Sequence, residues 1–335
     1  MSIRPSLRDA TYKGVTHALV AVSICASTTA SNAGNSTQNE VVLAFPNERG
    51  YGNISKVTRV NELETNAKRI PLGEAKGTIK LPPGTIVFYE PGPKFFQYPQ
   101  MIKKLAPNSI QYIKLQFTAM DDGEEKMSDS AIGYLPHLKS LQAATFDKSD
   151  TTDEGISKLA GMPNLRAVSA TESMVNGACL KSLASCPKLL MVRFGAIQIN
   201  NDSLSYLKDF KSLRRLVLSR SGLNSRGIQN ISMCQSVREL DISNNPKISD
   251  ADVPKIRSLK KLEYVNLRCT AVTISGVKAL TAGSNVRVIM PKMFSQYTKV
   301  EQDEIKRMKS NVRFDLDHIQ FDPDYKTIFG TINRK

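Results

Sequence analysis

Residues 110–291 repeat one short motif at a nearly constant interval: a hydrophobic residue followed by a Ser, Thr or Asn. The side chains of these polar residues can accept hydrogen bonds from the free amides of a helix's first turn. The seven capping positions step by 24, 24, 24, 24, 25 and 24 residues: Ser128, Thr152, Asn176, Asn200, Asn224, Ser249 and Thr273. A period of this length predicts a solenoid, in which each unit buries its apolar faces only against its neighbours.

Each repeat is expected to form a short strand, a loop and a helix. The strand signature is an apolar residue at the first, fourth and sixth positions, and the last two obey the two-residue period of a strand. In the second repeat this signature falls on Leu138, Leu141 and Ala143. After each cap, apolar residues recur at helical spacing. The first two repeats carry insertions, around residues 121–126 and 146–150.

The strand pattern L-x-x-L-x-L, followed by a helix that begins T/N-D-x-G-L-x-x-L, resembles the leucine-rich repeat family. The segment 152–159 is close to that helix start, and Cys186, Pro187 and Cys269 resemble the junctions of the family's cysteine-containing subclass. The resemblance implies a ribonuclease-inhibitor-like α/β horseshoe, with parallel strands on the concave face and helices on the convex face. Similar repeats occur in ubiquitin-ligase adaptors and in bacterial envelope proteins, but no segment before the repeats has the pattern of the adaptors' helical F-box.

Five segments are expected along the chain. The apolar run of the first segment follows basic residues and precedes small ones, which is the layout of a secretory signal, with a disordered or transit-type leader as the alternative. In the second segment, strands are expected at residues 41–45, 78–81 and 85–89. No later segment is apolar over the length that a membrane span needs. The segments are a signal peptide over 1–33, a linker and small β-rich module over 34–92, an N-terminal capping helix over 93–109, about seven repeats over 110–291, and a C-terminal capping helix, strand and tail over 292–335.

The residues between the strand apolars are expected to face the hollow of the horseshoe. Arg and Tyr on that face combine apolar area with directional donors, as binding hot spots do. In the second repeat the same rule selects Ser140, Gln142 and Ala144. An alternative is that the basic and acidic residues only pair with one another across the strands. The candidate ligand-binding residues are Tyr112, Lys114, Met191, Arg193, Arg215, Glu239, Asp241, Tyr264, Asn266 and Arg268.

Catalytic, cofactor and metal signatures are missing from the sequence. None of the three histidines has a nearby nucleophile with a base, and there is no phosphate-binding glycine loop and no two-Cys or two-His metal spacing. The aspartates between 315 and 324 could hold a divalent cation, although a solvated charged edge explains them as well. Cys179, Cys186, Cys234 and Cys269 are expected to be free thiols in the core.

The sequence favours a non-enzymatic, extracytoplasmic scaffold that binds a protein ligand on its concave face. We expect a monomer that is secreted, periplasmic or part of the cell envelope, without a cofactor. The formal net charge of +15 leaves a second class open, a protein that binds a polyanion such as nucleic acid or an acidic envelope polymer. An intracellular, cytoplasmic adaptor of the ubiquitin-ligase type is the third reading.

Overall fold

The computed structural model describes residues 40–59, 68–119, 126–308 and 312–313. Contacts divide the chain into two units, residues 1–38 and 39–335, and the fold described below belongs to the second. The predicted signal peptide lies outside the described residues. No helix in the described ranges has the length and apolar character needed to cross a membrane.

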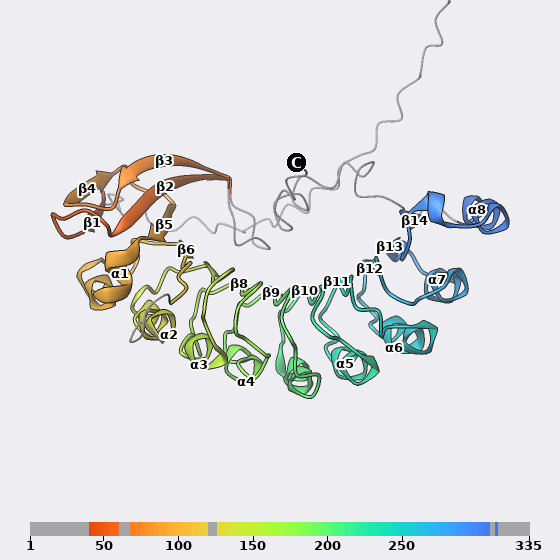
Figure 1. Cartoon of the computed structure of the whole chain (residues 1–335). Coiled ribbons are helices and arrows are strands. Elements are labelled where there is room, and N and C mark those ends of the chain that lie inside the picture. The colour runs from red at the N-terminus through yellow and green to blue at the C-terminus, as the bar shows by residue number, and fades with distance from the viewer. Residues whose placement is uncertain (1–39, 60–67, 120–125, 309–311, 314–335) are drawn as a thin grey trace, which may run out of the picture. The chain divides into compact units, whose positions relative to one another are not determined.

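The repeats form one long parallel sheet with one strand per repeat (Figure 1). Sequential strands are neighbours throughout, in the order β6 to β14, and each of these pairs is parallel. The strands are β6 Tyr112–Lys114, β7 Ala143–Thr145, β8 Ala167–Ser169, β9 Met191–Arg193, β10 Arg215–Val217, β11 Glu239–Asp241, β12 Tyr264–Asn266, β13 Arg287–Ile289 and β14 Val312–Arg313.

Short helices return the chain from each strand to the next on the outer side of the curved sheet (Figure 1). This arrangement confirms the predicted α/β solenoid with strands inside and helices outside. The helical elements are α2 Met127–Ile132, η2 Leu135–His137, α3 Asp153–Ser157, α4 Leu180–Leu183, η3 Ser203–Asp209, α5 Ser225–Ile231, η4 Asp250–Asp252, α6 Val253–Arg257, α7 Ile274–Thr281, η5 Phe294–Gln296 and α8 Lys299–Lys306.

The middle residue of each repeat strand points into the main core. These side chains are stacked in register and are 0% exposed: Ile113, Ala144, Val168, Val192, Leu216, Leu240, Val265 and Val288. Because side chains alternate along a strand, the first and third residues lie on the opposite face. We call the side chains at the first and third positions of β6 to β13 the concave surface.

The register predicted for the second repeat is wrong. Ala143 pairs with Tyr112 and Ala144 pairs with Ile113, so the core signature is Leu141, Ala144 and Phe146, all 0% exposed. A shift by one residue exchanges the two faces of a strand. Ala144 therefore lies in the core instead of the hollow. The predicted insertion at 146–150 disappears with the correction, because the paired residues Ala143 and Ala167 are 24 residues apart like those of later repeats.

The capping prediction is correct for four of the seven positions. Thr152 and Asn224 accept hydrogen bonds from the amides of Glu154 and Arg226, while Ser249 and Thr273 occupy N-cap positions of η4 and α7.

Asn176 and Asn200 bond the amides two residues ahead instead, in turns that precede α4 and η3. The prediction that Ser128 is an N-cap is wrong, because Ser128 lies inside α2, whose N-cap is Lys126.

Five strands precede the repeats in the described residues, and three of them continue the sheet at its N-terminal edge. β5 pairs in parallel with β6 and antiparallel with β2, which in turn pairs antiparallel with β3, while β1 and β4 form a separate antiparallel pair. β2 and β3 were not among the strands predicted from sequence. The strands are β1 Val41–Ala44, β2 Gly52–Arg59, β3 Lys68–Glu74, β4 Thr78–Leu81 and β5 Val87–Pro91.

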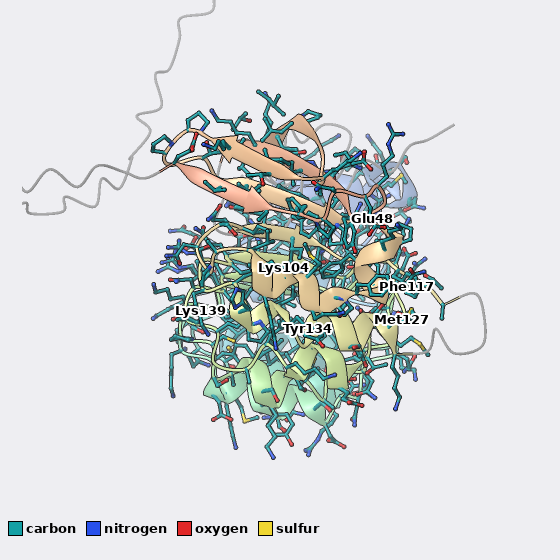
Figure 2. All side chains as sticks on the ribbon, turned by 90° about the vertical axis from the view of Figure 1, so that its left-hand side faces the viewer. Glu48, Lys104, Phe117, Met127, Tyr134 and Lys139 are labelled. Carbon is teal, nitrogen blue, oxygen red and sulfur yellow. The ribbon has the colours of Figure 1, made fainter. Side chains whose placement is uncertain are left out.

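A pair of short helices, α1 Pro93–Gln97 and η1 Pro99–Lys104, packs beside the first repeat. Phe95 and Phe96 are buried, and the Phe96 ring stacks on Phe117 with 4.7 Å between centroids. Figure 2 views this end of the chain, with Phe117 and Met127 near one edge and Tyr134 on the end face. The two helices thereby cover apolar groups that the first repeat would otherwise expose.

Three of the four cysteines in the described residues match the sequence prediction. Cys179, Cys186 and Cys234 are buried and free, whereas Cys269 is free but exposed. Cys269 follows the strand in the left-handed region, at φ 54°. The expectation that all four thiols lie in the core is therefore wrong for Cys269.

Candidate ligand-binding surface

Nine of the ten predicted site residues lie on the concave surface, and Arg268 follows it two residues after β12. Register places Met191, Arg215, Glu239 and Tyr264 side by side as first-position residues. Arg193, Asp241 and Asn266 occupy the third position of their strands. Tyr112 and Lys114 belong to β6, which β7 and β8 separate from β9. The ten residues therefore form a small group at the N-terminal end and a larger one from β9 to β12.

Arg193 is held in a buried polar cluster at the centre of the surface. Its Nε donates to Ser169 Oγ at 2.7 Å, and its Nη2 lies 2.5 Å from Asp147 Oδ2. Asp147 also accepts from Ser169 Oγ and from the amide of Thr171. These bonds fix the Arg193 guanidinium against the sheet and neutralise its charge locally. Asp147 was missed as a partner because the misplaced register put it in an insertion.

Arg215 pairs with Glu239 across neighbouring strands. Both Nε and Nη2 of Arg215 lie 2.5 Å from Glu239 Oε2. The two side chains are directly opposite in the β10–β11 register, so this pair is a rung of the intramolecular ladder that was the alternative reading. The ladder and a ligand site are compatible, since one terminal nitrogen of Arg215 stays outside the pair.

Unsatisfied polar atoms accompany these pairs. Arg215 is 8% exposed, and its Nη1 is buried without a hydrogen-bond partner. The hydroxyl oxygens of Thr145 and Thr171 are also buried without a hydrogen-bond partner. A buried donor without an acceptor costs about 1–3 kcal/mol. A ligand that supplied the missing partners would recover part of that free energy.

A polar group at β11 and β12 continues the surface. Asp241 Oδ1 accepts from both the amide and the hydroxyl of Ser243, and Asp241 Oδ2 accepts from Asn266 Nδ2 at 2.9 Å. Asn266 Oδ1 accepts from the amide of Arg268 at 3.1 Å. The Arg287 guanidinium lies 5.9 Å from the centre of the Tyr264 ring. Asp241 and Asn266 are thus buried and oriented by the protein, while Arg268 and Tyr264 remain partly exposed.

Tyr112 and Met191 do not present free side chains. They are 1% and 0% exposed and belong to a second apolar cluster, on the concave side, that also contains Phe88, Ala143 and Ala167. The Tyr112 ring stacks on Phe88 with 6.1 Å between centroids. Lys114 lies 3.6 Å from Glu90. The expectation that Tyr112 and Met191 are available as contact residues is therefore corrected: they form an apolar floor.

The cysteine and histidine side chains near the repeats have structural environments. Burial raises the pKa of the Cys186 and Cys234 thiols, and burial with the nearby Asp153 carboxylate raises the pKa of Cys179 well above its usual value. A raised pKa disfavours the thiolate that a nucleophile needs. His137 Nε2 lies 2.8 Å from the carbonyl oxygen of Leu105 and so connects the N-terminal helices to the second repeat.

One pocket lies away from the concave surface, between α7 and α8. Its volume is about 770 Å³, and Lys278, Val300 and Glu304 are among the residues that line it. Lys278 and Glu304 also form an ion pair with each other. None of the predicted site residues lines this pocket.

Comparison with known proteins agrees with the repeat geometry. Residues 234–256, which run from just after α5 through β11 and η4 into α6, match the family model for the Leucine Rich repeat. This segment of the chain thus matches a single leucine-rich repeat, in agreement with the α/β solenoid described above; the assignment to the cysteine-containing subclass remains a prediction.

Solved structures similar to this chain include an internalin (inlF) from Listeria monocytogenes, at 19% identity and a TM-score of 0.42 over 54% of each chain. Human 5T4 (Wnt-activated inhibitory factor 1, Trophoblast glycoprotein) is also similar, at 19% identity and a TM-score of 0.41, over 55% of this chain and 69% of that one. The aligned part spans about half the length of the internalin. No curated protein sequence matches the chain.

Proposed function

We propose that this protein is a non-enzymatic scaffold that binds a protein ligand through the β9 to β12 part of its concave surface. The observation that supports this most is the Arg215 guanidinium, which is buried on this face with one nitrogen unpaired. It is surrounded by prepositioned groups, since Arg193 is fixed by Asp147 and Asp241 is fixed by Asn266. Fixed donors lose little conformational entropy when a ligand binds.

The ligand chemistry follows from these groups. Arg215 Nη1 is a donor only, and guanidinium groups donate hydrogen bonds to carboxylate or carbonyl oxygens in a fixed geometry. Met191 and Val217 lie beside it on the same face, both buried. The surface suits an extended peptide segment that carries carboxylates between apolar side chains. The wider proposal includes an extracytoplasmic location, which depends on the predicted leader over 1–33.

A selection from a displayed library of random twelve-residue peptides tests the proposal on the full chain. We expect the enriched peptides to carry Asp or Glu among apolar residues. Binding should fall at least tenfold, or about 1.4 kcal/mol, on a chain carrying Arg193→Glu, Arg215→Glu and Arg268→Glu. Peptides that bind this variant as tightly as the wild type would move the site elsewhere.

The second candidate function, polyanion binding, is favoured by the net charge of +15. Association with heparin or with a twenty-base-pair DNA duplex would then weaken steeply with salt, because counterions are released on binding. A flat response between 50 and 200 mM salt, or no binding at low salt, excludes this function.

A further inference from the structure

The concave surface from β9 to β13 combines buried apolar side chains with arginines. Met191, Val217 and Ile289 are 0–1% exposed on this side of the sheet. Within the part of the chain that the structure describes, the helices cover the opposite side, and no helix or strand lies over β9 to β12 (Figure 1). These three apolar side chains are already out of contact with water, so an occupant of this face would meet chiefly the partly exposed polar side chains of Glu239, Tyr264, Arg268 and Arg287.

The charges of this region favour an acidic occupant. Arginines at 193, 215, 268 and 287 outnumber the carboxylates at 147, 239 and 241. Arg214 and Arg238 precede β10 and β11 by one residue and are exposed, but Arg238 forms an ion pair with Glu263, so only Arg214 adds to this excess. The unpaired Nη1 of Arg215 adds a buried donor that needs an acceptor.

The chain itself contains a segment with the matching chemistry directly after β14. Residues 314–325 read Phe-Asp-Leu-Asp-His-Ile-Gln-Phe-Asp-Pro-Asp-Tyr, with four aspartates, five apolar or aromatic residues and no Lys or Arg. The start Phe-Asp-Leu-Asp alternates apolar and acidic residues, so an extended backbone would place them on opposite sides.

The segment is also long enough to reach the surface. β14 ends at residue 313, and five strand steps separate β14 from β9. Neighbouring strands lie about 4.8 Å apart, so the span is roughly 24 Å. Twelve extended residues cover about 40 Å. The segment can therefore cross the whole of β9 to β13 without moving the repeats.

We propose that residues 314–325 of this chain bind the β9 to β13 concave surface in the same molecule and compete there with external ligands. The proposal rests on the proposed function, because it uses the same surface. An attached segment acts at an effective concentration in the millimolar range. An external peptide with the same acidic and apolar pattern must therefore bind the surface more tightly than residues 314–325 in order to displace them.

Hydrogen exchange of the full chain, read by mass spectrometry on peptides covering 314–325, tests the contact. We expect these amides to exchange more slowly than in the isolated synthetic peptide, and roughly tenfold faster in the Arg193→Glu, Arg215→Glu variant than in the wild type. The matched control is Lys211→Glu with Lys255→Glu, which changes the charge equally at exposed positions outside the strands and should leave exchange unchanged.

A second variant tests the same contact without changing any residue of the repeats, so its result does not depend on their stability. Asp315→Asn, Asp317→Asn, Asp322→Asn and Asp324→Asn alter only the segment, and should both accelerate its exchange and tighten binding of a displayed acidic peptide. Exchange of residues 314–325 at the rate of the isolated peptide in the wild type overturns the inference. If selected peptides still bind with the segment unprotected, the inference alone fails. If no peptide binds even the asparagine variant, the proposed function fails.

Discussion

At the scale of single residues, a carboxylate or amide one residue after the predicted cap position links one outer segment to the next at four of the repeat junctions. Asp129 accepts from the amide of Thr152, Asn201 from that of Asn224, and Asp250 from that of Thr273. Each bond joins one repeat to its successor. The T/N-D-x-G pattern therefore has a physical cause: the second residue bonds forward, and the glycine leaves room for the same residue of the preceding repeat.

A substitution at Gly155 tests the explanation that the glycine leaves room for the side chain of the preceding repeat. A Cβ at this position would lie 2.0 Å from Asp129 Oδ1, so Gly155→Ala should destabilise the chain by about 1–3 kcal/mol through overpacking. Chemical denaturation measures the change. In an Asp129→Ala background the contact with the carboxylate disappears and only a 3.0 Å approach to the Cα of residue 129 remains, so the same substitution should cost clearly less, helped by the preference of alanine for a helix. Equal costs in both backgrounds would contradict the steric explanation.

Thiol reactivity is a second prediction at this scale. Because burial raises the pKa of Cys179, Cys186 and Cys234, we expect iodoacetamide at neutral pH to modify Cys269 well before these three. Peptide mapping after brief labelling of the native chain reads the order, with the unfolded chain as control. Modification of Cys179 as fast as Cys269 would show that the repeat opens readily.

At the scale of elements, the strength of the N-cap differs between repeats. Asn224 Oδ1 accepts from the amides of both Arg226 and Gly227 at the start of α5. Asn176 accepts a single bond, at 3.3 Å, and precedes α4 by four residues. Asn224→Ala should therefore cost about 1 kcal/mol of unfolding free energy, and Asn176→Ala clearly less. The reverse order, measured by urea denaturation, would contradict the assignment of the caps.

The sequence was informative for most elements and misleading for one. The 24-residue period places β8 to β12 and their buried middle residues correctly, because an apolar residue marks each inward position. The second repeat offers Ala143 and Ala144 in sequence, and two adjacent small apolar residues do not reveal which one faces the core. Asp147 and Ser169, the partners of Arg193, are brought to it by stacking of separate repeats, so their contact could not be read from spacing within one repeat.

At the scale of the whole molecule, one continuous sheet joins the antiparallel strands β3, β2 and β5 to the parallel strands β6 to β14. In such a stack each repeat contacts only its neighbours, and stability is roughly a sum of repeat and interface terms. The concave surface is built from short strands of this rigid array, which keeps Arg193, Arg215 and Asp241 at fixed separations. Rigidity of this kind favours specific capture of a ligand over general attraction by charge.

The comparison of two variants with equal charge tests the central claim most directly. One carries Arg193→Glu, Arg215→Glu and Arg268→Glu on the concave surface or beside it, and the other carries Lys211→Glu, Arg226→Glu and Lys255→Glu at exposed positions outside the strands. Calorimetric titration with a selected peptide should give a dissociation constant at least tenfold weaker for the first variant and close to wild type for the second. Equal weakening of both variants would mean that net charge, and not the concave surface, binds the ligand.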